Sequence, residues 1–130
     1  MRTTSTAVHT LWVGLAGAAG AVARYRLGLA VGARTFPFAT LGINVAGCFL
    51  LGLLLGGPAA ERWPASATTA VAAGFLGAFT TFSTFGYEMF TLLRTGRIAS
   101  ALLYVLASVL AGVLAAGAGY AAGAAWRSSP

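Results

Sequence analysis

The sequence predicts an all-α membrane protein with four transmembrane helices. Of its 130 residues, 58% are hydrophobic and only 8% are charged, whereas about a quarter of the residues in a soluble domain are charged. The charged residues leave four uncharged runs, at 3–23, 35–60, 63–87 and 98–126. Each run exceeds the about 20 apolar residues that a helix needs to cross a bilayer. Peptide groups in lipid find no water to bond, so these runs must be helical. We therefore expect one four-helix transmembrane domain over residues 1–130.

Turn signals place these helices along the chain. The expected spans are residues 8–30, 38–57, 67–93 and 98–125. Pro37 suits the start of the second helix, because a missing N–H costs nothing there. A Gly-Gly-Pro run at 56–58 ends that helix, and Pro64 falls in the second loop. The Arg-Thr-Gly-Arg run at 94–97 predicts a tight turn before the fourth helix.

Small residues are dense on every expected helix. Those spaced three or four apart include Gly14, Gly17 and Gly20; Gly28 and Gly32; Gly52 and Gly56; and Gly119 and Gly123. This spacing lets helix backbones approach closely, which is a main source of helix affinity in lipid. We expect nearly all of these glycines to serve tight packing.

The charge pattern indicates a membrane setting and gives no reason to expect nucleic-acid binding. All eight basic residues are arginines and the net charge is +6. The arginines stand singly or in pairs at helix ends, where they anchor to lipid headgroups. The single cysteine excludes an intramolecular disulfide, and the lone His9 is expected at the interface. No carboxylate pair, His/Cys cluster or phosphate loop is apparent, so we expect no enzyme.

The two ends of the predicted helices carry similar numbers of arginines, so the positive-inside rule orients the chain only weakly. One end has Arg2, Arg62 and Arg127, and the other has Arg26, Arg34, Arg94 and Arg97, with Arg24 near the same boundary. We therefore hypothesise that the chain inserts both ways round and forms a dimer with its two-fold axis in the membrane plane. Labelling of engineered cysteines from only one face of intact cells would contradict this.

The stretch 74–85 places hydroxyls and phenyl rings at membrane depth, where polar groups are costly and usually functional. Its hydroxyls follow Gly74 and Gly77 and precede Gly86, which favours a locally weakened helix. Broken helices in membranes line cavities or bind ions. The alternative is an intact helix whose hydroxyls bond back to its carbonyls and whose rings serve packing. The residues by themselves leave both possibilities open.

The second and fourth helices carry polar residues one turn apart, hence on one face of each. These rows are Thr40, Asn44 and Cys48, and Ser100, Tyr104, Ser108 and Gly112. Hydrogen bonds between helices would explain both rows. Uncharged OH and NH donors, together with phenyl ring edges of positive partial charge, also suit an anion. We expect Glu88 to pair with an arginine or be solvated, and Arg24 to reach the headgroups.

Three segments resemble the Fluc (CrcB) fluoride channel family, and the four-helix layout covers the whole chain. Residues 17–25 are similar to its glycine-rich run ending in Arg-Tyr, and residues 40–49 to its Thr-Leu…Asn…Gly-x-Phe pattern. Residues 74–85 keep the family's Thr-Thr-Phe-Ser-Thr-Phe core, which is highly specific. Ala78 and Ala16 depart from the family, because many members have glycine there.

The resemblance implies an antiparallel dual-topology homodimer with two fluoride pores and a third helix broken at its centre. It implies that Asn44 coordinates fluoride, and that Phe82 and Phe85 line the pores with ring edges facing the anion. It also implies a structural Na⁺ on the dimer axis, bound by the backbone carbonyls of Gly77 and Thr80 and not transported.

Other site residues and the activity follow from the same resemblance. Ser83, Thr84, Tyr104 and Ser108 resemble the polar track beside the rings, and Arg24 would sit near a vestibule or support the fold. The implied protein is a multi-pass, fluoride-specific passive channel of the cell membrane that exports cytoplasmic fluoride and so reduces its toxicity. Its partners would be fluoride, Na⁺, the lipid bilayer and a second copy of the chain.

Two other functions remain open. A small multidrug transporter also has four helices, but it needs a titratable acid deep in the bundle, and Glu88 is expected too near a helix end. A non-transporting scaffold would use its polar residues only to hold helices together. Fluoride release from liposomes without a proton gradient separates the channel from both.

Overall fold

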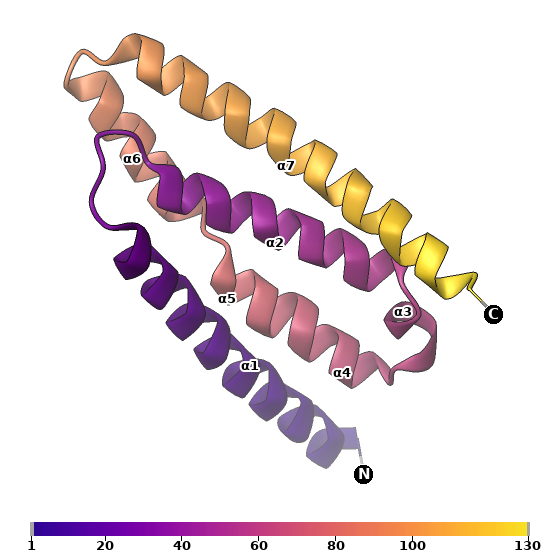
Figure 1. The fold of residues 1–130 in the computed structure, drawn as a ribbon. Helices are drawn as coiled ribbons and strands as arrows, with labels where there is room; N and C mark the ends of the chain where they lie inside the picture. The colour runs from indigo at the N-terminus through magenta and orange to yellow at the C-terminus, as the bar shows by residue number, and fades with distance from the viewer. Residues whose placement is uncertain (1, 130) are drawn as a thin grey trace.

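A computed structural model describes the backbone of residues 2–129 and the side chains of residues 6–129, so the side chain of Arg2 lies outside it. The elements, in chain order, are α1 (Arg2–Val31), α2 (Phe38–Gly56), α3 (Ala59–Arg62), α4 (Ala65–Thr69), the π-helical η1 (Ala70–Leu76), α5 (Gly77–Phe79), α6 (Phe82–Arg94) and α7 (Ile98–Arg127) (Figure 1). Four helical spans are long and apolar enough to cross a membrane, and the third, Ala65–Arg94, comprises α4 to α6. The predicted all-α architecture with four spans is confirmed.

The connections between the spans follow the turn signals of the sequence, with two additions. Pro37 directly precedes α2. After α6, Gly96 has a φ of 75°, which glycine adopts without strain, and Arg97 N–H donates to the Leu92 carbonyl at 2.9 Å. Two features differ from the sequence prediction: α1 begins at Arg2, earlier than expected, and the second loop contains the short helix α3.

Helices α2 and α7 run parallel and share the most extensive helix contact. Glycines on both helices bring the two backbones together. A Cβ on Gly52 would overlap the Ala116 carbonyl oxygen, and a Cβ on Gly119 would overlap the Phe49 carbonyl oxygen. The predicted packing role of these glycines is therefore confirmed.

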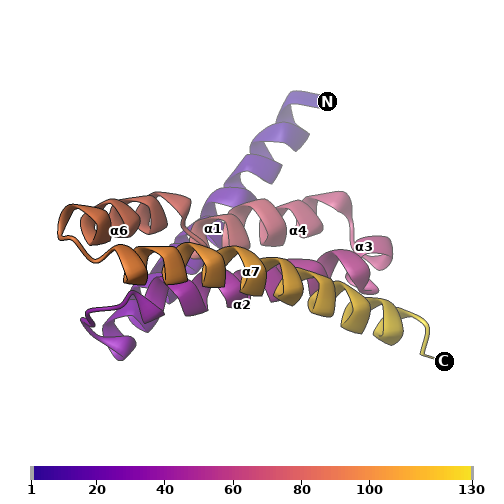
Figure 2. The same ribbon diagram turned by 90° about the horizontal axis from the view of Figure 1, so that it is seen from above.

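Helix α1 crosses η1 and also contacts α5. There Gly20 lies against the Phe75 carbonyl and Gly74 against the Val13 carbonyl. Elsewhere α1 is open: within residues 6–31, Gly20 alone is buried, and Figure 2 shows the N-terminal part of α1 running away from α2 and α7. Other glycines expected to pack have no atom within 4 Å of an added Cβ, namely Gly14, Gly28 and Gly32. Most of α1 is thus left for lipid or a second chain.

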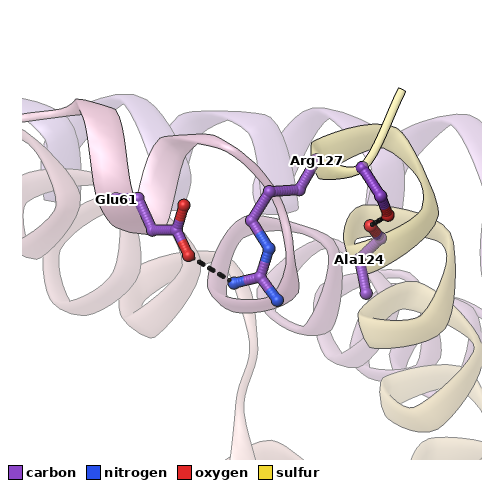
Figure 3. A network of polar contacts seen from close by, with 4 residues as sticks. Glu61, Ala124 and Arg127 are labelled. Carbon is purple, nitrogen blue, oxygen red and sulfur yellow. Dashed lines mark hydrogen bonds and ion pairs between the residues drawn. The ribbon is translucent and has the colours of Figure 1, made fainter. Parts of the chain in front are cut away.

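Both termini and α3 lie at one end of the molecule (Figure 1). At that end, Arg127 Nη1 and Glu61 Oε1 form a salt bridge of 2.8 Å that links α7 to α3 (Figure 3). At the other end, Arg97 Nη1 donates to the Thr35 carbonyl at 2.6 Å, which joins the first and third loops. The fold therefore keeps the two groups of arginines apart, as the sequence indicates.

The third span is interrupted at its centre. Thr80 has a ψ of 161° and Thr81 has φ −152° and ψ 114°, so both are extended between α5 and α6. The span bends by about 20° there. Residues 65–94 contain no proline, so every backbone N–H at the break is present and needs an acceptor. Side chains supply the hydrogen bonds that the interrupted helix has lost. The expected break is confirmed, and the π-helical η1 lies just before it, as such segments often do at functional sites.

Candidate functional site

Asn44 bridges the break from the facing helix α2. Its Oδ1 accepts the Thr81 N–H at 2.8 Å, and its Nδ2 donates to the Thr81 carbonyl at 3.1 Å. In a continuous helix this N–H would donate to the Gly77 carbonyl. Asn44 therefore holds Thr81 extended and relieves the Gly77 oxygen of its helical donor. The second amide hydrogen of Nδ2 is left over for another acceptor.

Thr81 begins the second half of the span by capping α6. Its Oγ1 accepts the Thr84 N–H at 3.2 Å, donates to Thr84 Oγ1 at 3.0 Å and lies 3.3 Å from Ser83 Oγ. In a continuous helix the Thr84 N–H would bond the Thr80 carbonyl, so the cap releases a second backbone oxygen. The Thr80 hydroxyl instead bonds back to the Leu76 carbonyl at 3.0 Å.

Arg24 reaches the break from α1. Its Nη1 donates to the Thr80 carbonyl at 3.4 Å, and the residue is half-buried. The side chain thus turns toward the centre of the third span and not toward the headgroups. A guanidinium at this depth needs an acceptor, and the broken helix supplies one.

The Gly77 and Thr80 carbonyls have the chemistry that Na⁺ requires. Hard cations prefer oxygen ligands, and both oxygens have lost their helical donors. Gly77 is exposed and lines a hollow of about 290 Å³ together with Asn44. Residues 6–129 contain no group of three His, Cys, Asp or Glu that could hold a metal. Backbone oxygen is therefore what the break offers to a cation, and further ligands would have to come from elsewhere.

The phenyl rings of the motif have different environments. Phe82 is 83% exposed, and its ring centroid lies 5.7 Å from that of Phe85. Phe85 also packs against the buried Tyr104, with 5.0 Å between centroids. Phe75 and Phe79 stack on each other at 5.9 Å before the break. Phe82 therefore projects from the single chain, whereas Phe85 joins its small core.

Glu88 is a site residue that the sequence did not reveal. It accepts hydrogen bonds from Thr40 Oγ1 at 2.9 Å and from Tyr104 OH at 2.7 Å, so the expectation of an arginine partner or simple solvation was wrong. The available signal was spacing, because Glu88 follows Thr84 by one turn and Thr40 precedes Asn44 by one turn. The two rows meet, and polar groups continue from the break to Glu88.

Two open hollows lie at the ends of this polar row. The hollow at the break, of about 290 Å³, includes Asn44 and Phe82. The second, of about 580 Å³, includes Glu88, Arg34 and Arg97. The arginines place positive charge at the second hollow, which favours the approach of anions.

Ser108 carries a buried hydroxyl that lacks a hydrogen-bond partner among the described residues. It lies one turn beyond Tyr104 on α7. Leaving a buried polar group unpaired costs about 1–3 kcal/mol, so such groups call for an explanation. A ligand, a water molecule or another chain would supply one. Ser83 and Thr84, by contrast, are exposed beside Phe82.

These features define a class: a polytopic helical membrane protein with a broken helix, backbone carbonyls released at the break, and uncharged donors and rings beside it. Irregular backbone at membrane depth is tolerated where it is buried in protein or lines a cavity or pore. The family described as "CrcB-like protein, Camphor Resistance (CrcB)" matches residues 11–120. The chain belongs to this family.

Relatives resemble it over nearly their whole length. "Fluoride-specific ion channel FluC 2" of Moorella thermoacetica is 48% identical over 115 residues, which cover 86% of this chain and 93% of the relative. "Fluoride-specific ion channel FluC" of Acidobacterium capsulatum is 44% identical over 117 residues, or 87% and 94% of the two chains. These are names of channels and not of enzymes. With its four spans, this chain is a multi-pass protein of the cell membrane.

Proposed function

We propose that this chain forms a passive, fluoride-specific channel. The observation that carries the proposal is Asn44, which has a second amide hydrogen beyond its bond to Thr81 and which lines a hollow together with the exposed Phe82. Amide N–H groups and ring edges present positive partial charge to an anion without a fixed countercharge that would trap it. The 44–48% identity to proteins named fluoride-specific ion channels supports the same conclusion.

The proposed path runs along the polar row from the break to the second hollow. Its groups are the amide of Asn44, the ring edges of Phe82 and Phe85, and the hydroxyls of Ser83, Thr84, Tyr104 and Ser108. Selectivity against chloride would come from a narrow path that replaces the tight hydration of fluoride by several donors. The Tyr104 hydroxyl hydrogen is bonded to Glu88, so Tyr104 would donate to fluoride only by leaving that carboxylate.

A structural Na⁺ and a second copy complete the proposal. Gly77 and Thr80 of two antiparallel copies would surround the cation with carbonyl oxygens on the dimer axis. The 83% exposure of Phe82 and the open face of α1 leave surface for the partner. The Na⁺ would hold the broken helices together and would not be transported.

Export follows from the chemistry of fluoride. Neutral HF crosses membranes and dissociates in a near-neutral cytoplasm, which traps the anion. A passive pathway lets fluoride leave down its electrochemical gradient. A negative-inside potential assists by about 2.3 kcal/mol per charge for each 100 mV. Fluoride toxicity would fall as a result.

The decisive experiment is efflux from liposomes loaded with potassium fluoride. Adding a potassium ionophore should release fluoride without a proton gradient, and the same vesicles loaded with chloride should release little. No fluoride release would contradict the channel. Release that requires a proton gradient would instead favour a proton-coupled exporter, a candidate because Glu88 is hydrogen-bonded between helices.

A further inference from the structure

Arg24 places a positive charge at the carbonyl that the break releases. Its Nη1 lies 3.4 Å from the Thr80 oxygen, and the helical donor of that oxygen, the Thr84 N–H, is taken by the Thr81 hydroxyl. A carbonyl without a donor is costly where no water reaches. In the single chain, therefore, Arg24 supplies the hydrogen bond that the broken helix lacks.

The reach of Arg24 depends on the close crossing of α1 and η1. Gly20, one turn earlier, leaves no room for a Cβ because the Phe75 carbonyl fills the space. A Cβ on Gly17 would meet the Gly74 carbonyl at 3.6 Å. Residues one turn apart share a helix face, so this contact directs Arg24 toward the third span.

The charge of Arg24 has no acidic partner. The chain holds two acids, Glu61 and Glu88. Glu61 pairs with Arg127 at the end that carries the termini. Glu88 accepts its hydrogen bonds from the uncharged Thr40 and Tyr104. A second cation at the break would therefore meet a guanidinium that no carboxylate neutralises.

We infer that Arg24 is a built-in competitor of the central cation. The inference rests on the proposed Na⁺ at the carbonyls of Gly77 and Thr80. A hard cation lies about 2.3–2.6 Å from a carbonyl oxygen, so it and the guanidinium nitrogen would be within about 6 Å of each other. Like charges that close repel strongly where little water separates them. Arg24 therefore satisfies the break before assembly and lowers the affinity for Na⁺.

The test measures assembly and not flux. Purified protein in liposomes is titrated with Na⁺ against N-methyl-D-glucamine at constant ionic strength, and the dimer fraction is counted by single-molecule photobleaching. Arg24→Gln should lower the half-saturating Na⁺ concentration at least tenfold. Arg24→Met keeps the apolar stem without charge and serves as a second variant if Arg24→Gln does not assemble.

The matched control is Arg26→Gln, which removes an equal charge from an exposed position on the same helix. Its half-saturating Na⁺ concentration should stay within twofold of the parent. An unchanged or raised value in Arg24→Gln, beside a normal Na⁺ response of the parent, would overturn the inference and leave the Na⁺ proposal intact. An equal fall in both variants would also overturn it, since the effect would be one of general charge. A parent chain indifferent to Na⁺ would overturn both proposals.

Discussion

The α2–α7 pair and the broken third span meet the same requirement in opposite ways. Peptide groups in lipid must be bonded. In the pair, both helices run uninterrupted, and glycines let their backbones touch. In the third span, helical bonds are given up and replaced by the side chains of Asn44 and Thr81. Packing alone stabilises the α2–α7 pair. In the third span, side chains take the place of helical partners, and this leaves backbone carbonyls and side-chain donors that can bind other groups. In this chain, the polar groups available to an ion lie where backbone hydrogen bonds have been replaced by side-chain hydrogen bonds.

Widening the α2–α7 contact should have the largest effect. Gly52→Ala places a Cβ where the Ala116 carbonyl oxygen stands. Overpacking costs about 1–3 kcal/mol, and we expect the upper end because the obstacle is backbone. The change should appear as a lower unfolding midpoint in detergent. Gly42→Ala on the same helix meets nothing within 4 Å and should be neutral; equal effects of the two changes would contradict the glycine contact.

Removing one of the hydrogen bonds between Asn44 and Thr81 should have the second-largest effect. Asn44→Asp can still accept the Thr81 N–H but cannot donate to the Thr81 carbonyl. It removes this hydrogen bond, although the carbonyl keeps its bond within α6 because Thr81 is the N-cap residue, and it puts negative charge in the proposed anion path. Fluoride efflux from liposomes should be lost. Cys48→Ala, one turn along the same face, should keep efflux within twofold, and undiminished efflux of Asn44→Asp would remove Asn44 from the path.

Replacing the Glu88 carboxylate, which lies beyond the break, should have a smaller effect. Glu88→Gln has one acceptor oxygen for two donors, Thr40 and Tyr104. One hydroxyl then loses its acceptor, and we expect a loss of about 1–1.5 kcal/mol in stability, measured by thermal unfolding. If Tyr104→Phe in the Glu88→Gln background costs as much as in the parent chain, the two side chains are not coupled.

Phe85 and Phe82 allow packing to be separated from a role in the anion path, because Phe85 is packed and Phe82 is not. Phe85→Ile should reduce fluoride flux and also lower stability by about 0.5–1.5 kcal/mol, because it loses the ring contact with Tyr104. Phe82→Ile, at an 83% exposed position, should reduce flux with little change in stability. Flux and unfolding are measured on the same samples. Wild-type flux in both variants would exclude the rings from the mechanism.

The smallest effect is expected outside both regions. Glu61→Gln removes the salt bridge to Arg127, and exposed pairs contribute less than about 1 kcal/mol. Fluoride flux should be unchanged, and any loss of stability should vanish in high salt because salt screens exposed charges. A loss that persists in high salt would show that α3 holds α7 by more than charge.

Local signals and contacts between helices differ in what they allow one to predict. The tight turn at Gly96 follows from residues adjacent in the chain, and it is present. The residues left the break of the third span open, the family resemblance implied it, and it is present at 80–81. Glu88 was misjudged because its donors, Thr40 and Tyr104, belong to other helices. Gly14 and Gly28 were expected to pack, yet no neighbour meets them, since spacing alone does not say which face meets another helix.

The sequence by itself determined the four spans, because crossing a bilayer depends on length and hydropathy along one segment. The Gly74–Phe85 motif likewise marked the family, and the break was implied by that resemblance. Only the tertiary structure decided which atoms hold the break. The Asn44 amide, the Thr81 hydroxyl and the Arg24 guanidinium converge there from three helical segments. Such convergence depends on how helices cross, and the crossing is set by packing between segments that the order of residues does not specify.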